Sequence, residues 1–217
     1  MGTERFIELS HSIEDGMETY PGIPAPRIKS FLSRDDAEKS YAPGTRFMIT
    51  ALDMVANTGT YIDAPYHRYD DGDDMEALSL ESVANVPGLC VRTNDRRIGP
   101  AVFDGLPLAG KAVLVATGWS QHWGRKSYAA DYPFLDRACG ELLVDAGAVL
   151  VGIDSPNIDD NTDGERPLHS TLLRAGIPIV EHLTGLSGLP ASGFRFFAVP
   201  PPIKGFTSFP VRAFALA

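Results

Sequence analysis

The chain has 217 residues, of which 44% are hydrophobic and 22% are charged, and its formal net charge is −9. This composition is typical of a globular protein, and the length predicts a single domain over 1–217. The acidic excess argues against nucleic acids and anionic membrane surfaces as partners, because both require clustered Lys and Arg side chains. We therefore expect small molecules or other proteins as partners.

Cysteine usage and the N-terminal sequence indicate where the protein works. The two cysteines, Cys90 and Cys139, form no C-x-x-C motif, which disfavours a disulfide scaffold and a thiolate zinc site. No segment approaches the ~20 apolar residues of a membrane-spanning helix, and the first residues lack a basic region followed by an apolar one. The sequence predicts a cytoplasmic protein without a membrane segment.

Short strands and turns are expected in the first part of the chain. Phe6 to Ser10 alternates apolar and polar residues as a strand does, and Phe47 to Val55 is expected to form a second strand. Between them, the loop over 17–25 is rich in turn-forming residues, and together with the loop over 159–166 it is expected to shape a pocket. The two strands therefore lead into, and frame, a loop that is a candidate for ligand contact.

The central part of the chain has α/β character. Continuous apolar runs over 111–117 and 148–153 predict buried strands, and apolar residues at helical spacing over 134–146 predict a crossover helix between them. A second helix is expected over 168–175, before a strand over 177–181 that ends in a carboxylate. The fold class is therefore α/β, with a mixed sheet and crossover helices.

The C-terminal segment 194–217 is rich in Phe, Val and Pro, and it is expected to form closing strands. Pro200 to Pro202 belong in a loop or at a sheet edge, because proline has no N–H to donate to a neighbouring strand. Polar side chains such as Asp154 and Glu181 follow the buried strands directly. Sites in α/β folds usually form at such strand ends.

The most informative segment runs from Asn57 to His67 and reads N-T-G-T-Y-I-D-A-P-Y-H. In an extended chain every second side chain points to the same face, so Asn57, Tyr61, Asp63 and His67 are expected to converge. An Asp and a His on one face can bind a metal, and they can also act as a carboxylate that orients an imidazole base. A surface turn is the structural alternative for so short a motif.

This segment resembles the signature H-x-G-T-H-x-D-x-P-x-H of the cyclase family, which includes bacterial kynurenine formamidases and isatin hydrolases. Further motifs match in the same order along nearly the whole chain: Leu9-Ser10-His11, Tyr20-Pro21-Gly22, Thr117-Gly118-Trp119, Gly152-Ile153-Asp154-Ser155, His169-Ser170-Thr171, Ile179-Val180-Glu181 and Pro210-Val211-Arg212-Ala213. The resemblance implies a swivelling β/β/α fold and a homo-oligomer, a dimer or a tetramer.

The resemblance also implies roles for single residues. Asp63 and Glu181 match the carboxylates that bridge two metal ions, and His169 matches a histidine ligand of the second ion. His67 matches the catalytic acid/base. In the family's chemistry the nucleophile is a metal-bound water that attacks an amide carbonyl, while the imidazole passes a proton to the leaving nitrogen.

Two positions depart from the family pattern. Asn57 and Tyr61 stand where two histidines complete the shell of the first metal. An amide offers only its carbonyl oxygen, and a phenol with a pKa of ~10 is a poor ligand. We therefore expect one divalent ion, Mn or Zn, held by the remaining three ligands, with the second metal site lost. Tyr20 matches an aromatic residue that contacts substrate in the family.

The sequence thus predicts a hydrolase of a small, aromatic amide, lactam or lactone, with kynurenine formamidase activity as the first expectation. One alternative is a metal-free descendant of the family, in which Asp63 orients His67 for ligand binding or acid/base chemistry. Another is a serine hydrolase that uses Ser120 with Asp154 and His169. The segment around that serine lacks the second glycine of a nucleophile elbow.

Overall fold

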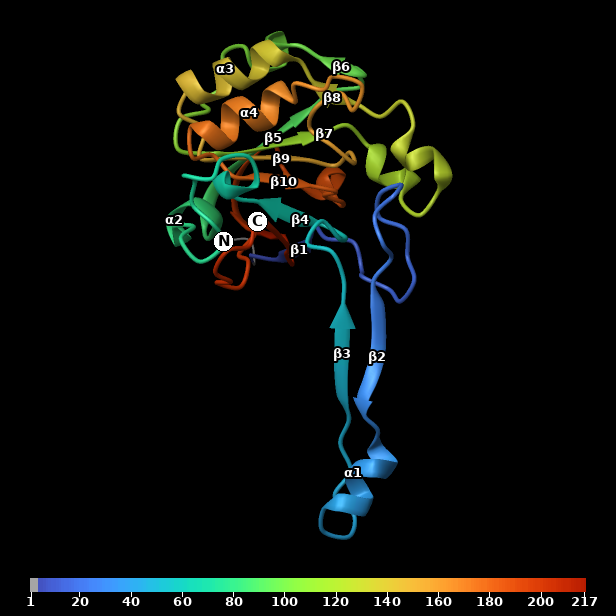
Figure 1. Ribbon diagram of the computed structural model, residues 1–217. Coiled ribbons are helices and arrows are strands. Elements are labelled where there is room, and N and C mark those ends of the chain that lie inside the picture. Colours follow the sequence, from blue (N-terminus) through green and yellow to red (C-terminus); the bar gives the residue numbers. More distant parts are fainter. Residues whose placement is uncertain (1–3) are drawn as a thin grey trace.

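The computed structural model describes residues 4–217 and has a mixed α/β architecture (Figure 1). The strands are β1 (Phe6–Glu8), β2 (Arg27–Leu32), β3 (Ile49–Asp53), β4 (Tyr61–Asp63), β5 (Val86–Arg92), β6 (Arg97–Ile98), β7 (Ala112–Ala116), β8 (Phe134–Leu135), β9 (Leu150–Ile153), β10 (Ile179–Glu181), β11 (Ser192–Phe197), β12 (Ser208–Pro210) and β13 (Phe214–Leu216). The α-helices are α1 (Arg34–Ser40), α2 (Leu80–Val83), α3 (Arg137–Asp145) and α4 (Pro167–Arg174).

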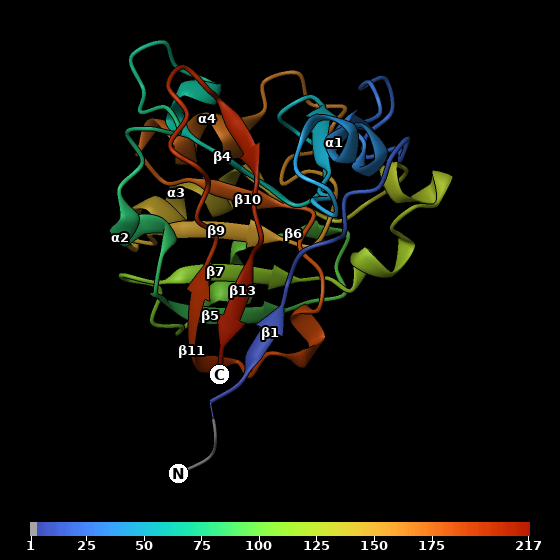
Figure 2. The same ribbon diagram turned by 90° about the horizontal axis from the view of Figure 1, so that it is seen from below.

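Nine strands form the main sheet in the order β1-β13-β11-β5-β7-β9-β10-β4-β12. The central strands β5, β7, β9 and β10 are parallel neighbours, whereas the strands on both flanks pair antiparallel. Helix α3 connects β7 to β9, and α4 connects β9 to β10, so both are crossover helices. The predicted α/β class with a mixed sheet is confirmed. Figure 2 shows β1 beside β13 at one end of this sheet.

Apolar side chains fill both faces of the central strands, because the parallel part of the sheet is covered on two sides. In β7, Val113 and Val115 join the core that includes Leu172 of α4. The intervening Leu114 faces the opposite way and joins the core that includes Phe194 of β11. The alternation of successive side chains thus assigns the residues of a single strand to two cores.

The first crossover helix begins three residues later than expected. Phe134 and Leu135 form β8, which pairs with β6, and the backbone N–H of Phe134 donates to the carbonyl of Arg96 at 2.9 Å. Asp136 then starts the helix, since its side chain accepts a hydrogen bond from the N–H of Ala138 at 3.2 Å. The helical spacing was correct, but the N-cap carboxylate fixes the start of the helix.

The other expected elements are observed with somewhat different bounds. The strands expected at 6–10, 47–55, 111–117, 148–153 and 177–181 are β1, β3, β7, β9 and β10, and the helix expected at 168–175 is α4. The C-terminal segment supplies three strands, and Pro200–Pro202 lies in the loop between β11 and β12. No helix within residues 4–217 has the length and apolar character needed to cross a membrane.

A hairpin arm, defined as residues 27–53, extends away from the main sheet (Figure 1). It consists of β2 and β3, which pair only with each other among the described strands, and of α1 at the tip. Phe31 on this arm is 77% exposed, and several further large apolar side chains are exposed beside it: Ile28, Tyr41, Met48, Ile49 and Leu52. The arm therefore presents an apolar surface that the body of the protein does not cover.

Gly88 in β5 provides a test of the packing between the sheet strands. A Cβ atom at this position would lie 1.9 Å from the ring of Phe194, so Gly88→Ala must displace a fully buried aromatic side chain. We expect the free energy of unfolding to fall by about 3 kcal/mol or more, measured by urea denaturation. The control Gly188→Ala adds a methyl group in open space. Equal stability of the two variants would contradict this account of the core.

Candidate active site

Three neighbouring strands bring the first polar groups of the site together. In the register of the sheet, Glu181 on β10 lies opposite Tyr61 on β4, and Asp63 on β4 lies opposite Ser208 on β12. The Tyr61 hydroxyl donates to Oε2 of Glu181 at 2.5 Å. The Ser208 hydroxyl donates to Oδ1 of Asp63, also at 2.5 Å. Each buried carboxylate thus receives a hydrogen bond from the strand next to it.

Tyr61 and Glu181 form a fully buried pair. Burial raises the pKa of Glu181 to about 7, because the charged form loses its hydration. Burial and the neighbouring carboxylates raise the pKa of Tyr61 well above its ordinary value, so this phenol keeps its proton and acts as the donor. The backbone N–H of Ile158 donates to Oε1 of Glu181 at 2.7 Å. Both oxygens of this carboxylate are therefore hydrogen-bonded within the protein.

His169 reaches the site from the first turn of α4, and Asp159 sets its orientation. Oδ1 of Asp159 accepts from the N–H of Leu168 at 2.7 Å, while Oδ2 accepts from the N–H of His169 at 3.1 Å. The same Oδ2 lies 2.6 Å from Nδ1 of the His169 ring. One buried carboxylate therefore satisfies the first N–H groups of the helix and leaves Nε2 of the ring pointing at Asp63.

The charges around His169 favour its protonated form. Burial by itself would lower its pKa, but the hydrogen bond with Asp159 and the nearby carboxylates of Asp63 and Glu181 raise it to about 10. Burial would likewise raise the pKa of Asp63, yet His67, His169 and Ser208 together lower it below its ordinary value. The site is thus a buried set of carboxylates that requires positive charge nearby.

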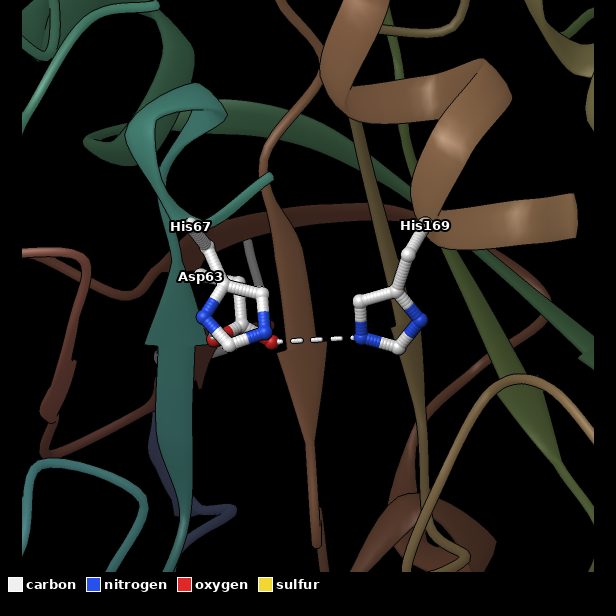
Figure 3. A group of neighbouring side chains, drawn as sticks. All are labelled: Asp63, His67 and His169. Atoms are coloured by element: carbon white, nitrogen blue, oxygen red, sulfur yellow. Dashed lines mark ion pairs between the residues drawn. The ribbon is translucent and has the colours of Figure 1, made fainter. Parts of the chain in front are cut away.

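Asp63, His67 and His169 form the group best suited to a metal ion (Figure 3). One ligand atom from each lies within 4.8 Å of the others. Nε2 of His169 lies 3.6 Å from Oδ2 of Asp63, and Nδ1 of His67 lies 3.6 Å from Oδ1 of Asp63. Both separations are too long for hydrogen bonds, and the one between His169 and Asp63 resembles the roughly 3.4 Å between neighbouring ligand atoms around a tetrahedral ion.

An unpaired oxygen supports the fit of a cation at this group. Among the described residues, Oδ2 of Asp63 is buried and has no hydrogen-bond partner, which is costly for a carboxylate. The three expected ligands Asp63, His169 and Glu181 also lie close, with Nε2 of His169 3.7 Å from Oε1 of Glu181. Both oxygens of Glu181 accept hydrogen bonds within the protein. The third residue whose ligand atom lies within 4.8 Å of those of Asp63 and His169 is His67. The assignment of Glu181 as a ligand remains a prediction.

The Asn57–His67 segment is extended only in part, and its side chains converge as expected. Only β4 is extended, because Gly59 takes a φ of +70° before it and Pro65 starts a 3₁₀ helix after it. Asn57 lies in a bend and donates from Nδ2 to Oδ1 of Asp63 at 3.4 Å. Turns on both sides of a short strand therefore bring these side chains together.

A cavity of about 220 Å³ opens beside this cluster. It is lined by Tyr20, Ile23, Asn57, Tyr61, His67, Arg68, Asn157, Arg166 and His169. The loop over 17–25 supplies Tyr20 and Ile23, so the expectation that this loop shapes a pocket is confirmed. Four of the sequence-predicted site residues line the cavity wall together with Tyr20, whereas Asp63 and Glu181 lie buried behind it.

Sequence reasoning missed several residues of the site. Asp159 could have been found as a carboxylate in the loop before a helix that carries a candidate ligand. Ser208 and Asn157 gave no signal, because a lone Ser or Asn in a loop or short strand is common. Arg68 is an ordinary surface residue by sequence, whereas Arg166 ends the loop over 159–166, which is expected to shape a pocket, and both residues line the cavity.

The alternative triad is not assembled. Ser120 and Asp154 line a different cavity from the one lined by His169. The Asp154 carboxylate accepts hydrogen bonds from the backbone N–H groups of Thr117 and Gly118 at 2.9 and 2.8 Å. The hydrogen-bond partners of Asp154 therefore lie in the loop after β7, and the carboxylate that binds the imidazole of His169 is Asp159.

His182 directly follows Glu181, but it points away from the metal-suited group. Its Nδ1 lies 2.9 Å from the hydroxyl of Tyr128, and its ring packs edge-on against Trp123. Its backbone φ of +56° differs from that of a strand residue, so the turn of the chain as well as the alternation of side chains directs it elsewhere. His182 is a buried, packed histidine.

Comparison with known proteins identifies the family of this chain. The model of the Cyclase family, described as "Putative cyclase", matches residues 7–160. The chain belongs to the cyclase family. The kynurenine formamidase of Geobacillus thermodenitrificans is 28% identical over 210 residues, covering 96% of this chain and 95% of that protein. The kynurenine formamidase of Bacillus cereus is 25% identical over 214 residues, covering 98% of each chain.

The cyclase fold is equally clear from solved structures. An isatin hydrolase with the product analogue thioisatinate bound aligns with a TM-score of 0.84 at 21% identity, covering 99% of this chain and 92% of that one. At this identity the likeness establishes the fold. The swivelling β/β/α fold expected from the cyclase motifs is therefore confirmed, and the catalytic roles within it rest on the residues themselves.

Asp159→Asn tests the link between α4 and the site. The amide would place an N–H₂ group against N–H donors that the carboxylate now accepts, so we expect the free energy of unfolding to fall by about 2 kcal/mol. The affinity for a divalent ion should fall by roughly 10- to 100-fold, because His169 loses its orienting partner. Urea denaturation and calorimetric titration with Mn²⁺ and Zn²⁺ measure the two effects.

The exposed Asp104→Asn makes the same chemical change away from the site and serves as control. An Asp159→Asn variant with the stability and metal affinity of this control would show that the carboxylate has neither role.

Proposed function

We propose that the protein is a metal-dependent hydrolase that cleaves the C–N bond of a small aromatic amide, with N-formylkynurenine-type formamides as the first substrates to test. The observation that carries the proposal is the group of Asp63, His67 and His169 beside a cavity of about 220 Å³. The relatives named kynurenine formamidase, which align over nearly the whole chain, support the substrate class.

The residues fit one divalent ion, manganese or zinc, which we propose Asp63 and His169 hold together with Glu181 or His67. Such an ion polarises a substrate carbonyl and promotes ionisation of water at neutral pH. Asp159 fixes the His169 ring so that Nε2 can serve as a ligand. Tyr61 and Asn57 stand where the family pattern has two histidines, and the Tyr61 hydroxyl donates to Glu181, which supports the loss of one of the family's two metal sites.

The hydrogen bonds around Ser208 suit His67 for proton transfer. Ser208 has a single hydroxyl hydrogen, which it donates to Asp63. Nδ1 of His67 lies 3.1 Å from the same oxygen and must therefore donate to it, which leaves Nε2 free to accept a proton. His67 is partly exposed and lines the cavity, so it can take a proton from water and pass it to the leaving nitrogen.

Variants of Asp63 and His67 separate metal binding from proton transfer. Purified protein should hold about one divalent ion per chain, and Asp63→Ala should lose both the ion and the hydrolysis of N-formylkynurenine. His67→Gln should keep the ion and lower kcat by about 100-fold or more. Elemental analysis and a spectroscopic assay of formamide cleavage provide the measurements.

Three outcomes would change the proposal. Loss of the ion in His67→Gln would make this residue a ligand. Two ions per chain would contradict the single site. Cleavage by a protein that remains metal-free after addition of Mn²⁺ or Zn²⁺ would favour acid/base chemistry in which Asp63 orients His67 through Ser208.

The chain also carries a feature that favours assembly into a homo-oligomer. An isolated two-stranded hairpin is marginally stable in water, yet the hairpin arm stands apart from the main sheet with exposed apolar side chains. We propose that the arm packs against a second copy of this chain in a dimer or tetramer.

A single domain over 1–217 and a cytoplasmic location remain our predictions.

Phe31→Asp tests the role of the arm in assembly. A charge in the centre of an apolar interface is costly, so we expect this variant to sediment as a monomer at concentrations where the wild type forms a dimer or tetramer. Glu38→Gln at the tip of the arm is a control at an exposed polar position. A wild-type monomer, or a Phe31→Asp variant of unchanged size, would refute the proposal.

A further inference from the structure

Two arginines lie at the candidate active site of a protein with a formal net charge of −9. Arg68 follows His67 directly, and Arg166 precedes the first turn of α4, which carries His169. Both side chains line the cavity. Neither guanidinium forms an ion pair with a carboxylate within residues 4–217, whereas the ion pairs of other arginines lie elsewhere on the surface. Their positive charge is therefore available to a ligand.

Arg166 is held in place by contacts that belong to the site. Its Nη1 donates to Oδ1 of Asn157 at 2.9 Å, and that same oxygen accepts from the backbone N–H of Asp159 at 2.9 Å. Its carbonyl accepts from the N–H and the hydroxyl of Ser170 at 2.9 and 2.8 Å. The guanidinium is thus tied to the loop that also orients His169 through Asp159.

The backbone of Arg166 is strained. Its φ is +50° and its ψ is +60°, in the left-handed region that favours glycine, and Pro167 follows it. Non-glycine residues in this region are uncommon, and they concentrate at functional sites where surrounding contacts hold them. The strained backbone therefore supports a functional role for the Arg166 side chain at the cavity.

The rest of the cavity wall indicates which groups a ligand carries besides one that pairs with the two arginines. Tyr20 and Ile23 offer an apolar surface to an aromatic ring, whereas His67 and His169 mark the reacting end. The side chain of Arg68 is exposed at the rim, where its Nη2 donates to the carbonyl of Glu165 at 3.2 Å. A ligand that fills the cavity meets an apolar wall, a reactive centre and two cationic side chains.

We propose that Arg166, assisted by Arg68, binds a carboxylate of the substrate, so that the enzyme prefers amides of aromatic acids to neutral aromatic amides. The inference rests on the proposed function, because it names the substrate class of the same site. Arginine is suited to the role, since its planar guanidinium can donate two parallel hydrogen bonds to a carboxylate. The unused N–H groups of Arg166 provide these donors.

Two formamides that differ by one carboxylate test the preference: 2-formamidobenzoate and formanilide. For the wild type we expect a higher kcat/KM on the acid. Arg166→Gln should lower kcat/KM on 2-formamidobenzoate by about 10- to 100-fold and change kcat/KM on formanilide by less than about threefold. Arg166→Lys should fall between the two, because it keeps the charge and loses the paired donors.

Arg174→Gln is the matched control. Arg174 is the last residue of α4, the helix that Arg166 precedes, and its guanidinium pairs with Asp71 and stacks over Tyr69 outside the cavity. This variant makes the same change in charge and should leave the ratio of the two kcat/KM values unchanged. An equal loss on both formamides in Arg166→Gln, or no loss on either, would overturn the inference while leaving the proposed function in place.

A binding measurement decides the inference independently of catalysis. 2-Aminobenzoate and 2-aminobenzamide are close in shape and differ in charge, and both are fluorescent. We expect the wild type to bind the acid more tightly and Arg166→Gln to reduce this preference by about 10-fold or more. If the wild type cleaves neither these formamides nor N-formylkynurenine, the proposed function fails, and this titration still decides whether the site prefers a carboxylate. Equal affinities of the wild type for the two compounds would refute it.

Discussion

The carboxylate of Asp159 is the contact on which the rest of the site depends. It accepts hydrogen bonds from the first backbone N–H groups of α4 and from the imidazole of His169, so the start of a helix and the direction of a ring are set by one buried group. The backbone N–H of Asp159 donates to the side-chain oxygen of Asn157, and the same oxygen accepts a hydrogen bond from Arg166. Helix formation, orientation of a candidate ligand and placement of a cavity cation are therefore coupled.

Buried negative charge is the second constraint. Asp63 and Glu181 are fully buried, and two carboxylates in such surroundings are costly unless protons, donors or cations accompany them. Ser208 and Tyr61 supply one donor to each carboxylate, and His169 supplies positive charge between them. On our proposal a metal ion replaces part of this charge, and Tyr61 donates a hydrogen bond where a family histidine would bind a metal ion.

The sequence was sufficient for the fold class and for the main candidates, because both depend on local patterns. Apolar runs identified the parallel strands, and the ordered motifs identified Asp63, His67 and His169. The bounds of the helices were harder to predict. Spacing alone does not show whether Asp136 caps the helix or lies inside its first turn. The hydrogen bond between Ser208 and Asp63 joins residues 145 positions apart, and no local pattern reports such a contact.

The antiparallel pairing of β4 with β10 has a consequence for the synthesis of the protein. Tyr61 and Glu181 are 120 residues apart, and Ser208 comes later still, so the ribosome must release most of the chain before the walls of the cavity can meet. Until then the carboxylate of Asp63 remains in water, where it needs no partner. Nascent chains therefore pass a long interval without a formed site, and the final strands of the sheet complete its chemistry.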